Sequence, residues 1–294
     1  MNVNYDLLKV FYIVAKNQSI SKAAKELNVS QPAVSQSIQN LEKSLAGQLF
    51  IRSKKGVTLT EEGKALFTDV NEGMNLIANG LEKFQEMRNL DVGKVRIGAN
   101  PIISKHILMP YLKKYHDKYP NIEIELVHES TINLLKQLKI GSIDLVVMSV
   151  PRKVLVDFEI YGFQDVQDVF IANSKYYEKA KSSSNIHELL KLPIIVEKSP
   201  SISRAYFDLL LKSRNLEYPP SMEVDSQDLL IDFVANGFGI GFATQEYIQD
   251  ELESKKIFII DVGQIPKRKV GLAISKKGNL SLSAQKLVDL IKEV

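Results

Sequence analysis

The spacing of apolar residues divides the chain into two parts. Up to about residue 90, apolar residues recur every three or four positions, which is typical of helices with one buried face. From residue 91 onward, short apolar runs alternate with helical stretches, which indicates an α/β domain with a mainly parallel sheet. The chain has 294 residues, which is longer than the chains that usually fold around a single hydrophobic core. We therefore predict the fold class as α/β with an all-α head.

Residues 19 to 47 predict two short helices separated by a tight turn. Ser19 and Ser30 each precede a helical run and can accept hydrogen bonds from the free N–H groups of its first turn. Pro32 fits the first turn of the second helix, where a missing N–H costs nothing. One stripe of this second helix is apolar and should be buried: Val34, Ile38, Leu41 and Leu45.

The opposite face of the second helix carries amides and hydroxyls, with one lysine. Gln and Asn can pair with an adenine edge, Ser can donate or accept, and a small Ala can lie against a thymine methyl group. The same pattern also describes an ordinary surface helix, so taken alone it leaves both interpretations open. The predicted DNA-contacting residues on this helix are Ser30, Gln31, Pro32, Ala33, Ser35, Gln36, Gln39 and Lys43.

The next segment favours the DNA-binding interpretation. It predicts a two-stranded wing with Lys54 and Lys55 at the tip and Arg52 at the base. Basic groups placed there would contact phosphates and hold the helix in register. Residues 1 to 60 hold eight Lys or Arg against three acidic residues, so positive charge is concentrated in the head. We therefore add Arg52, Lys54 and Lys55 to the predicted DNA-contacting residues.

Several spaced motifs together resemble the winged helix-turn-helix of the LysR-type transcriptional regulators: the run AAKELNVSQPAVSQSIQNLEKSL, the following LF, Arg52, Leu59-Thr60 and Gly63. Two features depart from the family. Many members carry Arg where this chain has Gln36 and Gln39, which leaves fewer charges for the groove. Members also commonly have Gly where this chain has Ala46, which allows the turn before the wing to shift by one residue to Gly47.

A long helix is predicted over residues 61 to 90, with Thr60 as its cap. Its seam has heptad-like spacing: Val70, Met74, Ile77, Leu81, Phe84 and Arg88. A helix of ~30 residues reaches ~45 Å, so its apolar face needs a partner, either the chain's own second domain or a second copy. We favour a second copy, because a dimer would present two recognition helices to a DNA site with two-fold symmetry. The family resemblance implies the same use of this helix.

The remaining chain, residues 91 to 294, predicts alternating strands and helices. Strands are expected over 95–99, 122–127, 144–148, 166–172, 193–196, 221–224, 239–243, 257–261 and 270–274. Helices are expected over 105–118 with an interruption near Pro110, and over 131–140, 203–212, 228–235 and 281–292. This layout resembles the two-lobed, periplasmic-binding-protein-like effector domain of the same family. We expect lobe I over 92–161 and 266–294, and lobe II over 162–265.

Ligands of open α/β sheets bind beyond the carboxyl ends of the strands, where helices begin. Hydroxyls and free N–H groups at several such helix starts would favour a small anionic effector, a carboxylate, sulfate or phosphate. Lys105, Lys198 and Arg204 could add positive charge. For any single Ser or Thr the alternative is a plain helix cap. The predicted effector-binding residues are Asn100, Pro101, Ser104, Ser130, Thr131, Ser149, Lys198, Ser199, Ser201, Ser203 and Asp225.

Composition narrows the remaining function classes. The chain has no cysteine, which excludes disulfides, thiolate catalysis and cysteine-ligated metals. No signal peptide and no apolar stretch of ~20 residues is present, so we expect a cytoplasmic protein without membrane contact. The four histidines are scattered, with His128 the best catalytic candidate, and neither GxSxG nor a P-loop occurs. We predict no enzyme activity, no metal site and no cofactor.

The sequence therefore predicts a sequence-specific DNA-binding transcriptional regulator of the LysR type. Its DNA binding or promoter activity would be controlled by a small anionic effector bound between two α/β lobes. The expected partners are double-stranded promoter DNA with inverted-repeat half-sites, the effector, and further copies of the chain in a homodimer that assembles to a homotetramer. The resemblance allows RNA polymerase as a further partner. The alternative is a solute-binding or catalytic α/β protein whose N-terminal helices only mediate assembly.

Overall fold

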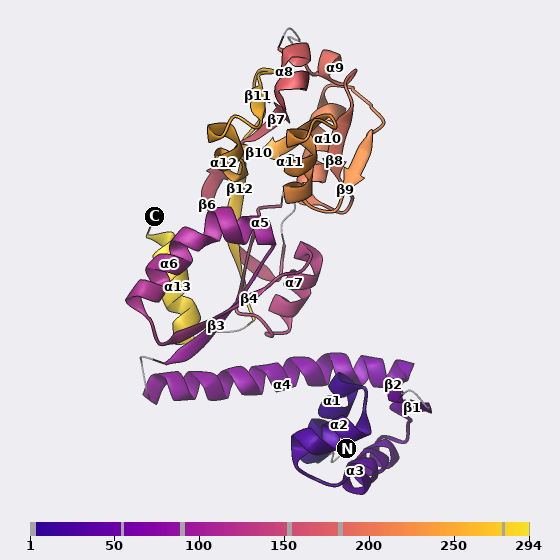
Figure 1. Ribbon diagram of the computed structural model, residues 1–294. Coiled ribbons are helices and arrows are strands. Elements are labelled where there is room, and N and C mark those ends of the chain that lie inside the picture. The colour runs from indigo at the N-terminus through magenta and orange to yellow at the C-terminus, as the bar shows by residue number, and fades with distance from the viewer. Residues whose placement is uncertain are drawn as a thin grey trace. The chain divides into compact units, whose positions relative to one another are not determined.

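The computed structural model describes residues 4–53, 56–88, 92–151, 155–181, 185–277 and 280–293. The chain separates into two compact units, one formed mainly by Met1–Arg88 and the other mainly by residues 89 to 294. The first unit contains the helical head and one long helix, and the second contains two sheets covered by helices (Figure 1).

The head is a helix-turn-helix followed by a wing. Its elements are α1 (Tyr5–Asn17), α2 (Ile20–Leu27), α3 (Gln31–Leu45), β1 (Phe50–Ser53) and β2 (Gly56–Leu59). The predicted caps are confirmed: the Ser19 hydroxyl accepts from the N–H of Lys22, and the Ser30 hydroxyl from the N–H of Ala33, each at 3.3 Å. The apolar stripe of α3 packs against α1 and α2, because Val34, Ile38 and Leu41 lie in the same core cluster as Phe11.

The end of α3 differs from the expected shift of the turn to Gly47. Ala46 itself closes the helix in the left-handed conformation, with φ 52° and ψ 32°, and its N–H donates to the carbonyls of Glu42 and Lys43. The turn therefore keeps the family position, although a residue with a Cβ occupies it. A left-handed L-residue costs roughly 1–2 kcal/mol, and glycine avoids that cost.

We predict that Ala46→Gly raises the free energy of unfolding of the head by about 0.5–1 kcal/mol. The relieved strain exceeds the extra entropy that glycine gives the unfolded chain. A urea titration followed by circular dichroism measures the change. An unchanged or lower midpoint would show that the left-handed conformation at this position carries no strain.

The long helix α4 (Glu61–Arg88) begins inside the head core. The Thr60 hydroxyl caps it by accepting from the N–H of Gly63 at 2.9 Å. The Phe67 ring stacks on Tyr12 with ring centroids 6.1 Å apart. Val70, expected in the heptad-like seam, packs against the head core. Farther along, large apolar side chains are exposed: Leu76, Ile77, Leu81, Phe84 and Met87. The side chain of Arg88 lies outside the described residues.

Two five-stranded sheets form the lobes of the second unit. In lobe I the order is β4-β3-β5-β12-β6, and in lobe II it is β11-β7-β10-β8-β9. The strands of lobe I are β3 (Gly93–Ala99), β4 (Ile122–Val127), β5 (Leu145–Ser149), β6 (Phe158–Val166) and β12 (Arg268–Ser275). Those of lobe II are β7 (Asp168–Ala172), β8 (Ile194–Glu197), β9 (Met222–Val224), β10 (Ile240–Thr244) and β11 (Phe258–Ile260).

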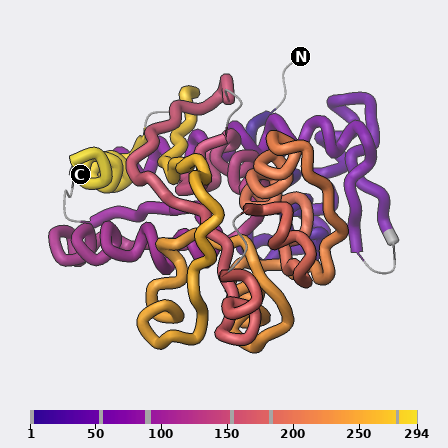
Figure 2. Tube along the Cα trace, turned by 90° about the horizontal axis from the view of Figure 1, so that it is seen from above, coloured from indigo at the N-terminus to yellow at the C-terminus, as the bar shows by residue number. Residues whose placement is uncertain are grey.

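Helices cover both sheets. Lobe I carries α5 (Pro101–Ile103), the π-helical turn η1 (Ser104–Leu108), α6 (Met109–Lys118), α7 (Thr131–Lys139) and α13 (Leu282–Lys292). Lobe II carries α8 (Ser174–Ala180), α9 (Ile186–Leu189), α10 (Ile202–Ser213), α11 (Gln227–Ala235), η2 (Gln245–Tyr247) and α12 (Gln249–Glu253). In lobe I, the last helix α13 returns to pack beside α6 (Figures 1 and 2). The predicted interruption near Pro110 is the π-helical turn directly before α6.

Two expectations about the sheets are corrected. Both sheets mix parallel and antiparallel pairs, because β12 returns between β5 and β6 antiparallel to each, and β7 runs antiparallel to β10 and β11. The predicted strand 166–172 is also interrupted at Gln167, where β6 ends and β7 begins. Since β6 pairs with β12 as far as Val166, the chain leaves the lobe I sheet later than the expected boundary at residue 161.

Candidate DNA-binding surface and ligand cleft

The polar face of α3 is open to solvent in the head. Ser35 is half-buried on this face, and the other predicted residues are exposed: Ser30, Gln31, Pro32, Ala33, Gln36, Gln39 and Lys43. The Gln36 amide donates to the Asn40 side chain, four residues along the same helix, at 3.0 Å. Arg52 is exposed on β1, while Lys54 and Lys55 lie outside the described residues. The face thus carries the donors and acceptors that base edges match.

Glu42 joins the wing to α3, a role that the sequence did not suggest. Its carboxylate accepts from the backbone N–H of Leu49 at 2.8 Å and of Phe50 at 3.3 Å. A negative charge on a helix that faces DNA is unfavourable. An acidic residue at this position was therefore a weak sequence signal for a structural role. The contact fixes the start of β1, and with it Arg52, relative to the polar face of α3.

A cleft of about 650 Å³ is lined by residues of both lobes in the second unit. It receives most of the predicted effector-binding residues: Asn100, Pro101, Ser130, Thr131, Ser149, Ser201, Ser203 and Asp225. Three predicted residues are not part of its lining. Ser104 is buried and donates to the Asn100 carbonyl at 3.0 Å, Lys198 pairs with Asp225 at 3.1 Å, and Ser199 is exposed.

Several of the polar residues in the cleft also cap their own helices. The Asn100 side chain accepts from the N–H of Ile103 at 2.8 Å, and the hydroxyls of Ser201 and Ser226 accept from Arg204 and Leu229 at 3.3 Å. Each of these side chains therefore lines the cleft and also caps its own helix, while its role in effector binding stays a prediction. The caps leave fewer free N–H groups at the helix starts than the sequence suggested.

A buried cluster lies between the lobes at the cleft. Arg268, at the start of β12, binds the Asp168 carboxylate through two hydrogen bonds of 2.7 and 2.9 Å. The same guanidinium donates to the hydroxyls of Ser149 and Thr244. Burial opposes its charge, but the hydrogen bonds and the charge of Asp168 outweigh that effect and raise the pKa of Arg268. The cluster joins two strand ends of lobe I, those of β5 and β12, to two strands of lobe II, β7 and β10.

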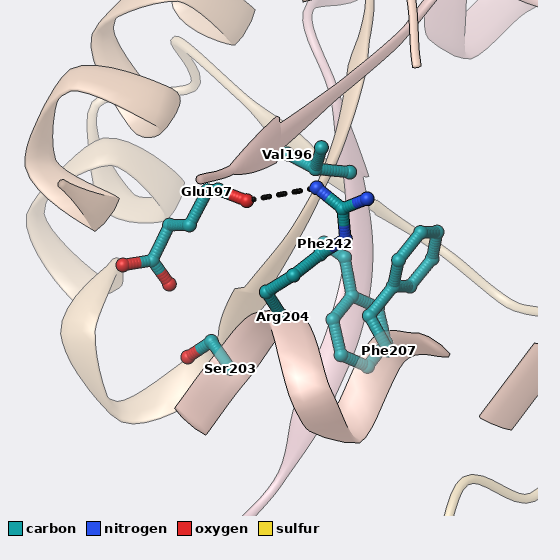
Figure 3. A pocket seen from close by; sticks show the side chains of 6 residues that line it. All are labelled: Val196, Glu197, Ser203, Arg204, Phe207 and Phe242. Atoms are coloured by element: carbon teal, nitrogen blue, oxygen red, sulfur yellow. Dashed lines mark hydrogen bonds between the residues drawn. The ribbon is translucent and has the colours of Figure 1, made fainter. Parts of the chain in front are cut away.

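Arg204 does not supply charge to the cleft. Its guanidinium binds Asp208 at 2.8 Å, Glu223 at 2.6 Å and the Glu197 carbonyl at 3.1 Å. Figure 3 shows it beside Phe207, on the side opposite the Glu197 carboxylate. The small pocket there holds about 10 Å³, room for no more than one water molecule. Lys105, the third expected cation, is exposed and does not line the cleft.

Family models identify both parts of the chain. The bacterial regulatory helix-turn-helix of the lysR family matches residues 5–64, and the LysR substrate binding domain matches residues 88–294. The chain therefore belongs to the LysR family of transcriptional regulators. It is a transcriptional regulator with an N-terminal DNA-binding domain and a C-terminal effector-binding domain, as the sequence predicted.

Relatives and solved structures agree with this assignment. The RuBisCO operon transcriptional regulator of Allochromatium vinosum is 25% identical over 278 residues, covering 95% of this chain and 91% of that protein. A probable RuBisCO transcriptional regulator of Emiliania huxleyi is 27% identical over 253 residues, covering 84% of this chain and 81% of that protein. The fold matches CbnR, a LysR family transcriptional regulator, with a TM-score of 0.69 at 18% identity over 99% of both chains. The structure of full-length CbnR complexed with its target DNA matches with a TM-score of 0.70, again at 18% identity over 99% of both chains.

Proposed function

We propose that the polar face of α3 enters the major groove of promoter DNA and reads base edges there. The observation that carries the proposal is the exposure of Gln31, Gln36 and Gln39 on a helix whose opposite face is fixed in the head core. Amides in that position can form two hydrogen bonds with adenine. Arg52, with Lys54 and Lys55 beyond it, would contact phosphates from the wing.

The exposed apolar face of α4 supports a homodimer. Ile77, Leu81 and Phe84 follow the predicted seam and are about 60% exposed, with values of 61%, 62% and 61%. An apolar strip of this length is unfavourable in water and is suited to a second copy of the same helix. A dimer would place two α3 helices on inverted-repeat half-sites. Assembly to a homotetramer, contact with RNA polymerase and a cytoplasmic location are parts of the proposal that rest on the family alone.

The cleft between the lobes is the proposed effector site. Its volume suits a small molecule, and its lining comes from both lobes, so a ligand there would favour one arrangement of the lobes over another. We propose a regulator without catalytic activity, because both parts of the chain match domains of a family of transcriptional regulators. His128, the best catalytic candidate, is exposed, and its Nδ1 lies 2.9 Å from the Ala99 carbonyl oxygen. Along the described parts of the chain, no helix combines the length and the apolarity needed to cross a membrane.

Selection from a pool of random duplexes tests the proposal. The full-length protein should enrich one sequence with two inverted half-sites, and its affinity for that duplex should fall steeply as salt rises, since counterions are released from the phosphates. Failure to enrich any sequence at low salt would support the alternative, a solute-binding protein whose head serves only assembly.

Arg52→Ala should weaken binding by a similar factor for the selected duplex and for unrelated duplexes. A phosphate contact carries no sequence information, so its loss should also reduce the slope of log affinity against log salt by about 1. Fluorescence anisotropy titrations at several salt concentrations measure both quantities. A loss confined to the selected sequence would instead place Arg52 on a base.

A further inference from the structure

The cleft between the lobes carries more negative than positive side chains. Its acidic lining residues are Glu129, Glu197, Asp225 and Asp228, whereas Arg268 is the cation among the described lining residues. Arg268 is already matched by Asp168, and Asp225 by Lys198. Within the described chain, Glu129, Glu197 and Asp228 form no ion pair. An anionic ligand would therefore meet unfavourable charge here.

Glu197 is the carboxylate best placed to bind a ligand. It ends β8, and burial raises its pKa, although hydrogen bonds from Ser203 and Ser201 oppose the rise. In Figure 3 its carboxylate and the Ser203 hydroxyl lie away from the Arg204 guanidinium. A carboxylate has about four lone-pair sites, so two hydroxyl donors leave capacity for another donor. The charge of Arg268 also opposes the rise in pKa, but Arg268 is already bound by Asp168. A desolvated carboxylate that forms no ion pair of its own is unfavourable, and a ligand cation would reduce that cost.

Tyr247 offers a second polar group to a ligand in the cleft. Its side chain lines the cleft and is only 3% exposed, and its hydroxyl has no hydrogen-bond partner in the described structure. Burial raises the pKa of Tyr247 to about 12, so the hydroxyl stays protonated and able to donate at neutral pH. Buried hydroxyls are normally paired, so this one is available to donate to a ligand atom in the cleft.

The other walls of the cleft are apolar. Ile102, Ile103 and Ile132 of lobe I face the same space as Ile202 and Leu209 of lobe II. Such walls suit a ligand with a hydrocarbon body, while the polar groups fix its orientation.

We propose that the effector is a small organic cation with an apolar body, whose protonated nitrogen is bound by Glu197 and whose hydrogen-bond acceptor faces Tyr247. The proposal rests on the proposed function in taking the cleft as the effector site. It replaces the anionic effector that the sequence suggested, because the helix starts at Asn100, Ser201 and Ser226 are already capped by their own side chains.

Matched ligands of one shape and different charge test the proposal. Two matched sets of compounds, each with an amine, a carboxylate and an alcohol, are added at millimolar concentration to the full-length protein. The first set is hexylamine, hexanoate and hexanol, and the second is 2-phenylethylamine, 3-phenylpropanoate and 2-phenylethanol. The amines should raise the Tm by roughly 3 to 6 °C, the shift for a ligand at about ten times its Kd, and the other compounds by less. The proposal fails if no amine shifts the Tm or if the carboxylates shift it more.

Variants separate a binding role from a structural one. Glu197→Gln should remove the amine shift while leaving the ligand-free Tm unchanged or higher, because a desolvated charge is lost. Glu217→Gln, the same change at an exposed site of lobe II, should keep the full shift. Tyr247→Phe should raise the ligand-free Tm, since it removes an unpaired buried hydroxyl. Retention of the shift in Glu197→Gln would overturn the proposal.

DNA binding is measured on the same protein preparations, so that failure of the cationic-effector proposal can be told apart from failure of the DNA-binding proposal. Intact, sequence-selective DNA binding without an amine shift would reject the cationic effector and leave the DNA-binding proposal standing. An amine shift that Glu197→Gln abolishes, in a protein that selects no DNA sequence, would support the cleft assignment and reject the DNA-binding proposal.

Discussion

Asp168→Ala is expected to lower the free energy of unfolding of the effector unit by about 3 to 5 kcal/mol. Asp168 is 2% exposed and is the carboxylate that neutralises Arg268, itself 4% exposed. Its removal leaves a buried guanidinium whose remaining described partners are uncharged: the hydroxyls of Ser149 and Thr244, and the ring of Tyr206 at 5.6 Å. Chemical denaturation monitored by tyrosine fluorescence measures the loss.

A neighbouring ion pair provides the matched control. Asp165 lies on the adjacent strand β6 and pairs with Lys269 at 3.0 Å, but both side chains are exposed. Asp165→Ala should therefore cost less than about 1 kcal/mol, because water screens the pair. The double change Asp168→Leu with Arg268→Met should recover much of the lost stability, since it leaves no uncompensated charge. Equal losses for Asp165→Ala and Asp168→Ala would contradict the importance of burial.

Gly63→Ala is expected to destabilise the head by about 1 to 3 kcal/mol, although alanine favours helices. A Cβ at Gly63 would lie 2.2 Å from the Leu49 carbonyl oxygen, which also accepts from the N–H of Thr60 at 3.0 Å. The backbone just before β1 would have to move away from α4 and disturb the wing. Thermal unfolding of the head and DNA affinity should both decline.

Gly73→Ala in the same helix is the control, because no atom lies within 4 Å of the added Cβ. It should raise helix stability by up to about 1 kcal/mol through helix propensity alone. If the two alanine variants were equally stable, the close approach between α4 and Leu49 would have no energetic weight.

Local signals in the sequence were sufficient for the head. Serine caps, a proline in the first turn and a regular apolar stripe act over a few residues, and the structure confirms them at Ser19, Ser30 and Pro32. The left-handed conformation of Ala46 was not predictable from such local signals. Favourable backbone hydrogen bonds at the end of α3 outweigh the preference of alanine for right-handed conformations, and residue type alone does not show that balance.

The cleft was predicted only in part, because its polar groups meet through long-range contacts. Strand ends correctly indicated Asn100, Ser130 and Ser201 as lining residues. Asp168 and Arg268 are 100 positions apart, and no local pattern connects them. Tyr247 lies in a short helix after β10 and resembles an ordinary core aromatic in sequence. The prediction of an anionic effector did not include Glu129, Glu197 and Asp228, which the fold brings to the cleft, and the charge of the effector stays untested.

A base-pair specificity profile decides whether the polar face of α3 reads bases. The wild-type protein and three α3 variants are titrated against the selected duplex and each of its single base-pair substitutions. The variants are Gln31→Ala, Gln36→Ala and Gln39→Ala, and Gln85→Ala on α4 is the control. We expect each α3 variant to lose about 1 to 3 kcal/mol of discrimination at one base pair of each half-site. Profiles identical to wild type for all three variants would contradict the claim.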